Sequence, residues 1–420
     1  MNSYRSFNSI KDAIKAKKTN CLSLTKSYLQ NIEELKTLNA FVEVFEEEAI
    51  ARAKIIDNKI AKGKAGKLAG MVIGIKDNIC YKNHKVGAAS KMLEGFESLY
   101  NATVVERLLE EDAIIIGRLN CDEFAMGSAN ENSHYGPTKN PNDISKVSGG
   151  SSGGAATAVA ANLCLTALGS DTGGSIRQPS SFCGTVGLKP TYTRVSRFGL
   201  IAFASSFDQI GPITNTVEDA AIILEVIAGK DDYDSTVSTK KVEKYSKLLE
   251  DKKPKRIAYF SECFERDGLD KEVKSTILKQ IQTLKSKGHI VEKISFPYLD
   301  YLVPAYYVLT TAEASSNLAR FDGVYFGYRS EKGINTETTY LKTRTKGFGK
   351  EVQRRIMLGT FVLSAGYHDA YYTKAQKMRG LIQDKTKEIF NDYDFILTPT
   401  TPHTAFDLGL EVKNPVAMYL

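Results

Sequence analysis

The chain has 420 residues, of which 42% are hydrophobic and 25% charged, a composition typical of a soluble globular protein. Its formal net charge of +7 gives only a weak preference for anionic partners, and it lacks a basic stripe typical of an RNA-binding groove. No apolar run is long enough to span a bilayer, and the first 20 residues lack the apolar core of a secretory signal. The six cysteines form no CxxC motif, which fits a reducing compartment. We therefore expect a cytoplasmic protein, although the basic, serine-containing N-terminus leaves an organellar location open.

The first half of the chain alternates predicted helices with short, strongly apolar strands. The region 1–65 is predicted to be helical, because its stretch 46–63 places acidic residues first and lysine late, as the helix dipole favours. The elements predicted after it are a strand at 71–75, a helix at 103–112, a strand at 114–116, a helix at 153–162, a strand at 163–169 and a helix at 216–228.

The second half begins with residues 230–256, which are rich in charge and are predicted to form a surface excursion. The elements predicted after it are a strand at 256–260, a helix at 270–287, a strand at 290–291, helices at 304–319 and 350–390, and a strand at 394–400. Strands that alternate with helices indicate an α/β fold with a largely parallel sheet.

Two glycine-serine clusters flank the unit at 153–169: GGSSGG at 149–154 and TGGS at 172–175. Glycines let the backbone turn sharply, and successive N–H groups in such a turn form a concavity that binds anions. Gly/Ser runs are often flexible linkers, but these clusters directly adjoin a predicted helix-strand unit. Ser151 and Ser175 are therefore candidate nucleophiles for acyl transfer.

The base that would activate such a serine is either a histidine or a lysine. The GGSSG stretch matches the G-x-S-x-G elbow of α/β-hydrolases, but a poor strand precedes it and none of the five histidines lies in a turn that resembles a catalytic loop. Lys76 directly follows a buried strand, where α/β active sites form, and burial would lower its pKa enough to give a neutral amine. On local sequence alone, the pattern slightly favours a Lys76 that ends a strand and pairs with Asp77 at the surface.

Three motifs in a fixed order resemble the amidase signature family: GIKDN at 74–78, GGSSGG at 149–154 and DTGGSIR at 171–177. The resemblance implies an amidase domain that spans 1–420. It also implies a single large α/β domain with a mixed, mostly parallel twisted sheet covered by helices on both faces.

The same resemblance implies a Ser–cis-Ser–Lys triad. Ser175 would be the nucleophile, Ser151 would relay the proton through a cis peptide, and Lys76 would be the base. Preorganised N–H donors stabilise the oxyanion of such a reaction. The family's oxyanion hole corresponds to the backbone N–H groups of Thr172, Gly173, Gly174 and Ser175.

Within the family, the stretches 120–128, 312–323 and 351–360 are similar to the glutamine-hydrolysing subunits of tRNA-dependent amidotransferases. That similarity implies release of ammonia from glutamine for conversion of Glu-tRNA(Gln) to Gln-tRNA(Gln). A partner B subunit would bind Glu-tRNA(Gln) and use ATP and Mg, and a C subunit would complete a heterotrimer. The chain has no Walker A motif, which fits ATP chemistry on a partner, and we expect no metal or cofactor in this chain.

The similarity also implies residues for glutamine itself. Arg355 would bind the α-carboxylate bidentately, Tyr306 would line the pocket, and Ser128 would touch the substrate. The competing interpretations are a helix-surface arginine, which suits Arg354 better, and a core aromatic residue at Tyr306.

The C-terminus departs from the family pattern. Relatives continue after the position of 417–419 with an aspartate that binds the α-amino group of glutamine, so the chain is expected to lack the C-terminal part of the amidase domain. Two alternatives therefore stay open: a stand-alone amidase of the same family, and a truncated, non-catalytic scaffold subunit.

Overall fold

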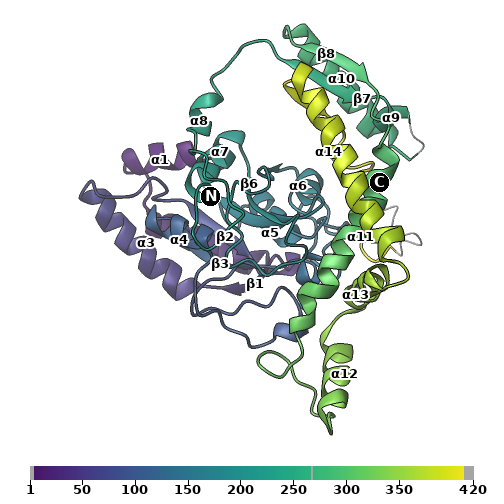
Figure 1. The fold of residues 1–420 in the computed structure, drawn as a ribbon. Helices are drawn as coiled ribbons and strands as arrows, with labels where there is room; N and C mark the ends of the chain where they lie inside the picture. The colour runs from purple at the N-terminus through teal and green to yellow at the C-terminus, as the bar shows by residue number, and fades with distance from the viewer. Residues whose placement is uncertain (1–3, 266–267, 411–420) are drawn as a thin grey trace. The chain divides into compact units, whose positions relative to one another are not determined.

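The structure is a computed structural model that describes residues 4–265 and 268–410, and Figure 1 shows its ribbon. The chain divides by packing into two compact units. The first unit contains the chain up to Leu249, residues 317–354 and residues 407–409, and the second contains residues 250–316, 355–406 and 410. Each unit is described by itself.

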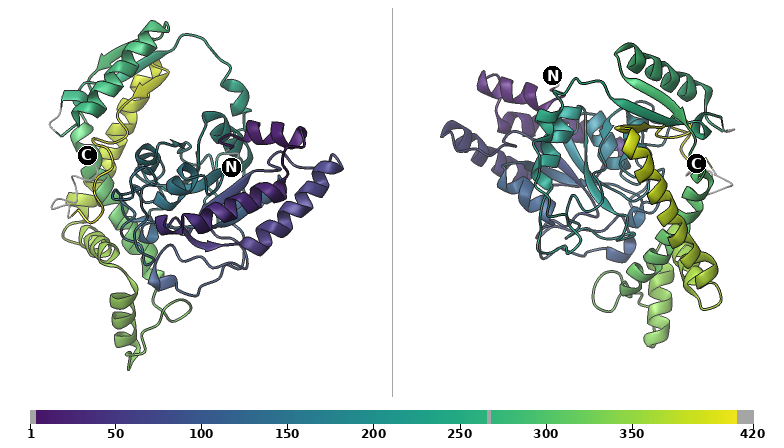
Figure 2. Two further views of the ribbon diagram at one scale, coloured as in Figure 1. Left: turned by 180° about the vertical axis from the view of Figure 1, so that it is seen from behind. Right: turned by 45° about the horizontal axis from the view of Figure 1, so that its top comes forward.

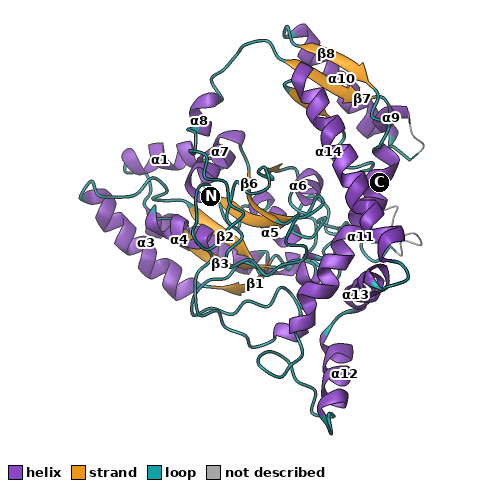
Figure 3. Cartoon of the chain, viewed as in Figure 1, coloured by secondary structure: helices purple, strands orange, loops and turns teal. Residues whose placement is uncertain are grey.

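The first unit is built on a six-stranded sheet with the strand order β1-β3-β2-β4-β6-β5. Figure 3 draws the strands in orange and the helices in purple. Strands β2, β3 and β4 are parallel to one another, and β1, β5 and β6 pair antiparallel to their neighbours. Every residue of β2, β3, β4 and β6 is buried, which fits the mainly apolar sequences of β2 and β3, whereas β4 and β6 also bury polar residues such as Asp171 and Gln209. The strands are β1 (Phe41–Val44), β2 (Val72–Lys76), β3 (Ile114–Leu119), β4 (Thr166–Asp171), β5 (Val186–Gly187) and β6 (Gln209–Thr214).

Helices cover this sheet: α3 packs on β3, α5 on β2, β4 and β6, and α7 on β6, while α2 lies along α3 (Figure 2). Several begin with a side-chain cap, such as Asn20, which accepts the Ser23 N–H at 2.8 Å. The helices of this unit are α1 (Phe7–Lys15), α2 (Cys21–Glu34), α3 (Glu46–Ala61), α4 (Thr103–Glu110), α5 (Gly153–Ala160), α6 (Arg177–Cys183), α7 (Val217–Ile227), α8 (Tyr245–Leu248) and α12 (Thr336–Gly347).

The second unit has its own sheet of three parallel strands in the order β8-β7-β9, with small clusters of buried apolar residues against it. Its strands are β7 (Arg256–Phe260), β8 (Ile290–Ile294) and β9 (Phe395–Leu397). Its helices are α9 (Glu262–Glu265), α10 (Lys271–Ser286), α11 (Leu299–Asn317), α13 (Lys350–Leu363) and α14 (Lys374–Asp392), of which α11 and α13 each cross the boundary between the units.

The predicted α/β fold with a mixed, mostly parallel sheet is confirmed, since four of the seven strand pairings among the described residues are parallel. The second sheet is an addition that the sequence did not indicate. The elements that the sequence analysis also missed are β1, β5, β6, α6, α8, α9 and α12. The single helix predicted at 350–390 is two helices, α13 and α14, separated by residues 364–373. None of the described helices is long and apolar enough to cross a bilayer.

Candidate active site

The three sequence motifs meet at one edge of the six-stranded sheet. Lys76 is the last residue of β2, which runs parallel to β4 with Ile75 opposite Leu168. The turn 172–175 leaves the carboxyl end of β4, and Ser151 and Ser152 directly precede α5. Because the carboxyl ends of parallel strands lie at the same edge, the fold gathers residues that are distant in sequence.

The Lys76 amine is enclosed by three serine hydroxyls. Its Nζ lies 2.7 Å from Ser151 Oγ, 2.9 Å from Ser152 Oγ and 3.0 Å from Ser170 Oγ. Lys76, Ser151 and Ser152 have no exposed surface. The structure thus excludes the alternative in which Lys76 pairs with Asp77 at the protein surface.

The three hydroxyls differ in where their protons and lone pairs are used. Ser152 donates its proton to the Ser170 carbonyl at 3.1 Å, and Ser170 Oγ accepts the Asn78 amide at 2.9 Å. Ser151 Oγ has Lys76 as its partner among the described residues. Ser151 is therefore the hydroxyl best placed to exchange a proton with the amine.

Burial governs the protonation of this lysine. Removal from water lowers the pKa of Lys76, because desolvation penalises the charged form, and the nearby charges of Asp122, Asp171 and Asp208 oppose part of that shift. A lowered pKa increases the fraction of neutral amine, which is the form that accepts a proton.

The Ser151 backbone is set by close packing. The Gly150–Ser151 peptide bond is cis, as the family resemblance implied. A Cβ at Gly150 would overlap Asp122 Oδ2 and lie 2.8 Å from the Asn130 nitrogen, so only glycine fits at this position. The Asp122 N–H donates to the Ser151 carbonyl at 3.2 Å, which fixes the position of the peptide that carries the hydroxyl.

Ser175 lies in the turn after β4 and is 8% exposed, unlike the fully buried Ser151. The Ser152 N–H donates to the Ser175 carbonyl at 3.0 Å, which joins the two glycine-serine clusters. Gly174 has a φ of +129°, a backbone conformation that residues other than glycine rarely adopt. This backbone path gives Ser175 partial access to solvent while it stays next to the buried serines.

One N–H group of the predicted oxyanion hole has an acceptor inside the turn itself. The Gly174 N–H donates to Asp171 Oδ1 at 2.8 Å, so it is already occupied by an acceptor inside the turn. By contrast, the N–H groups of Thr172, Gly173 and Ser175 donate no hydrogen bond within the described part of the chain. The sequence could not distinguish them, because the Asp171 side chain folds back on the turn that follows it.

Ser128 lies in the loop that packs on the cis peptide. It is 8% exposed, and the nitrogens of the next two residues, Ala129 and Asn130, lie against Gly150. The structure thus brings the Ser128 loop to the Ser151 segment.

Arg355 and Tyr306 belong to the second unit. Arg355 is 2% exposed and its guanidinium lies over the ring of Tyr307, 5.5 Å from the ring centre, so it is a buried cation rather than a helix-surface arginine. Tyr306 lies on α11 and is half-buried. The expected aspartate site after 417–419 lies outside the described residues.

The histidines of the first unit are engaged away from the serines. His84 Nε2 pairs with Glu48 at 2.8 Å and stacks on Tyr81, and the His134 ring packs against Tyr135. These contacts give no support to a Ser-His-Asp arrangement.

Sequence reasoning overlooked Ser152, Ser170 and Asn78. Each lies one or two positions from a residue that was selected: Ser152 follows Ser151, Ser170 precedes the DTGGSIR motif, and Asn78 closes GIKDN. A search for every hydroxyl or amide at the carboxyl ends of β2 and β4 would have found Asn78 and Ser170, and Ser152 lies inside the GGSSGG motif.

The chain is similar to known proteins along most of its length. Residues 23–420 match the Amidase family. The A subunit of the glutamyl-tRNA(Gln) amidotransferase of Chlorobium phaeobacteroides is 49% identical over 420 residues, which cover 99% of this chain and 88% of the relative.

Solved structures show the same similarity. The crystal structure of the A subunit of glutamyl-tRNA(Gln) amidotransferase from Thermotoga maritima matches with a TM-score of 0.77 at 42% identity, over 95% of this chain and 82% of that one. The native peptide amidase from Stenotrophomonas maltophilia matches with a TM-score of 0.75 at 30% identity, over 87% of this chain and 77% of that one. The chain therefore belongs to the amidase family.

Proposed function

We propose that the chain is the glutamine-hydrolysing subunit of a glutamyl-tRNA(Gln) amidotransferase. The similarity to the A subunits of such enzymes along nearly the whole chain supports this assignment over other amidases. The observation that carries the chemistry is the buried contact between Lys76 Nζ and Ser151 Oγ at 2.7 Å.

In the first step, Ser175 Oγ attacks the carboxamide carbon of glutamine. Its proton passes to Ser151, and the Ser151 proton passes to the neutral Lys76 amine. The N–H groups of Thr172, Gly173 and Ser175 stabilise the oxyanion, and removal of one such donor costs about 3–4 kcal/mol of barrier height in comparable sites.

In the second step, the carbon–nitrogen bond breaks and the leaving nitrogen takes the proton back from Lys76 through Ser151, which releases ammonia. A glutamyl ester remains on Ser175. Water then attacks this ester with the same base, which yields glutamate and restores the serine.

Substrate recognition in this proposal uses a buried cation and two polar side chains. Arg355 binds the α-carboxylate of glutamine, since a guanidinium pairs with a carboxylate bidentately. Tyr306 lines the pocket and Ser128 contacts the substrate.

The ammonia serves a reaction on another chain. We propose that a B subunit binds Glu-tRNA(Gln) and activates it with ATP and Mg, that a C subunit completes a heterotrimer, and that the complex acts in the cytoplasm. The chain itself would need no cofactor.

The test is Ser175→Ala in the assembled complex, measured in two assays. Glutamine hydrolysis and glutamine-dependent amidation of Glu-tRNA(Gln) should both disappear, and amidation with added ammonium should persist. Glutamine turnover by Ser175→Ala would refute the assignment of the nucleophile, and loss of the ammonium-dependent reaction would indicate a damaged complex.

A second candidate is a stand-alone amidase, favoured by the shared fold of the peptide amidase from Stenotrophomonas maltophilia. It predicts that the isolated chain hydrolyses simple amides faster than glutamine. A non-catalytic scaffold predicts that a fluorophosphonate leaves Ser175 unlabelled.

A further inference from the structure

Asp208 lies directly opposite the nucleophile turn. Strand β6 runs antiparallel to β4 with Gln209 paired to Asp171, so the residue before β6 faces the residue after β4. Asp208 Oδ1 accepts the Thr172 hydroxyl at 2.6 Å. This side-chain contact joins the first residue of the turn 172–175 to the neighbouring strand.

The second carboxylate oxygen fixes a different segment. Asp208 Oδ2 accepts the N–H groups of Phe203 at 2.9 Å and Ala204 at 3.1 Å, and the Asn317 amide donates to the Phe203 carbonyl at 3.1 Å. The carboxylate therefore connects the nucleophile turn to the loop 201–208, and that loop is held in turn by the Asn317 amide. Asp208 is 3% exposed, so these contacts are shielded from water.

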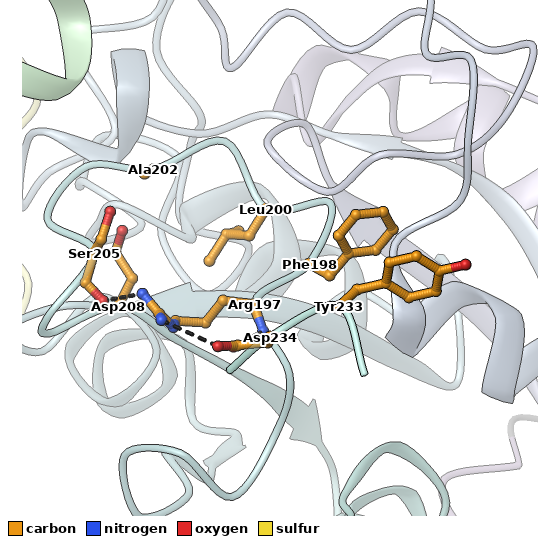
Figure 4. Close-up of a pocket in the computed structure, with 8 residues that line it drawn as sticks. All are labelled: Arg197, Phe198, Leu200, Ala202, Ser205, Asp208, Tyr233 and Asp234. Atoms are coloured by element: carbon orange, nitrogen blue, oxygen red, sulfur yellow. Dashed lines mark hydrogen bonds and ion pairs between the residues drawn. The ribbon is translucent and has the colours of Figure 1, made fainter. Parts of the chain in front are cut away.

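A pocket of about 190 Å³ adjoins this carboxylate, and Figure 4 shows the residues that line it. Arg197 lies between the Ser205 carbonyl and Asp234, with which it forms an ion pair at 3.3 Å. Asp234 is buried like Asp208, but its hydrogen-bond partners are the Arg197 and Thr236 groups rather than the turn. The pocket thus offers two buried carboxylates, of which Asp208 contacts the nucleophile turn.

We propose that Asp208 is a positioning residue for the amidase reaction, which acts through Thr172 to hold the oxyanion N–H groups of the turn 172–175 in place. The inference rests on the proposed function only in taking Ser175 as the nucleophile. A misplacement of about 1 Å at a reacting centre lowers rates roughly 100-fold, so a tether on this turn has a large effect on turnover.

A second consequence is electrostatic. The carboxylates that act on Lys76 by charge are Asp122, Asp171 and Asp208, and the negative charge of Asp208 raises the pKa of Lys76 against the lowering caused by burial. Removal of that charge lowers the pKa of Lys76 further, so the acid limb of the kcat/KM profile moves to lower pH.

The experiment compares Asp208→Asn, Thr172→Val and their double variant in glutamine hydrolysis by the assembled complex. Each single variant should lower kcat roughly 10- to 100-fold with little change in KM. The kcat of the double variant should be no lower than that of the less active single variant, because both substitutions break the same hydrogen bond. Thr172→Ser, which keeps the hydroxyl, should restore most of kcat. Only the variants that lack the Asp208 charge should move the acid limb.

Asp234→Asn is the matched control, since it removes a buried carboxylate from the same pocket and should leave kcat within about twofold. Thermal unfolding of each variant separates loss of fold from loss of positioning, and Thr172→Val keeps the test available if Asp208→Asn does not fold. An unchanged kcat in folded Asp208→Asn and Thr172→Val overturns the proposal while Ser175→Ala stays inactive. Strictly additive losses in the double variant also overturn it, and activity in Ser175→Ala overturns the proposed function instead.

Discussion

Arg177 holds Asp171 with two nitrogens: Nη2 lies 2.9 Å from Oδ1 and Nε lies 3.0 Å from Oδ2. The same carboxylate accepts the N–H groups of Gly174 and Ile176, on either side of Ser175. The fully buried Asp171 therefore holds the backbone of the nucleophile turn by hydrogen bonds, and the half-exposed Arg177 neutralises its charge.

The first prediction concerns this ion pair. Burial tends to raise the pKa of Asp171, but the hydrogen bond and charge of Arg177 lower it overall. A lowered pKa in the folded state stabilises the protein above the ordinary aspartate pKa, and the stabilisation is lost as pH falls through the folded value. Arg177→Gln should cost about 1–3 kcal/mol at pH 7, after allowance for solvent screening of the arginine, and less near pH 3.

Urea unfolding at the two pH values measures this difference. Arg354→Gln, which breaks the surface pair with Glu351, is the control and should change stability little at either pH. A loss that is equal at both pH values would show that Arg177 acts by packing and not by charge.

The second prediction concerns the base. Because burial lowers the pKa of Lys76 and only the neutral amine accepts a proton, kcat/KM should rise with pH through that lowered pKa. Lys76→Arg, which stays charged, should lose roughly 100- to 10,000-fold in kcat at every pH. A pH–rate profile from pH 5 to 10 checks this, and a Lys76→Arg enzyme that regains activity at high pH would contradict it.

The third prediction concerns Glu123, which is 5% exposed and accepts the Gly349 N–H at 2.8 Å and the Ser90 hydroxyl. Burial raises the pKa of Glu123 to about 7, against the lowering by its two hydrogen bonds. A raised carboxyl pKa means that the folded state binds the proton more tightly than the unfolded state. The contribution of Glu123 to the free energy of unfolding is therefore greatest below the ordinary glutamate pKa, and it is lost as pH rises toward 7.

Glu123→Gln should remove this decline, which amounts to roughly 3 kcal/mol between pH 4 and 8. The measurement is the free energy of unfolding of both proteins across that range. Glu94→Gln, at an exposed position, should reproduce the wild-type slope. Parallel curves for wild type and Glu123→Gln would mean that Glu123 does not titrate in this window.

The fourth prediction concerns Gly150. Gly150→Ala places a methyl group against Asp122 Oδ2 and should cost about 1–3 kcal/mol of stability, together with most of the activity. Gly380→Ala makes the opposite test, because its Cβ meets nothing within 4 Å on helix α14. It should stabilise the protein by about 0.5–1 kcal/mol, and thermal melts of the two variants should shift in opposite directions.

Sequence reasoning succeeded where a local pattern reports directly on burial. Strands β2 and β7 were placed within one residue, because a fully apolar run or a sharp change from charged to apolar residues marks their starts. The Lys76–Ser151 contact was implied by the resemblance of three ordered motifs to the amidase signature family, and not by any local pattern.

The misses have physical causes that a local pattern does not carry. Strand β1 is a four-residue edge strand that is only half-buried, so its alternation is too short to detect. Asp208 lies 36 residues after Thr172, and only the antiparallel pairing of β4 and β6 brings the two together. Likewise, the occupied N–H of Gly174 depends on how the Asp171 side chain folds back.

The absence of any exposed surface on Lys76 has a chemical consequence beyond proton transfer. Reagents that acetylate amines should modify the lysines on the outside of the protein and spare this one for as long as the fold stays closed. The rate of Lys76 acetylation, followed by mass spectrometry, would then measure how often this edge of the sheet opens to solvent.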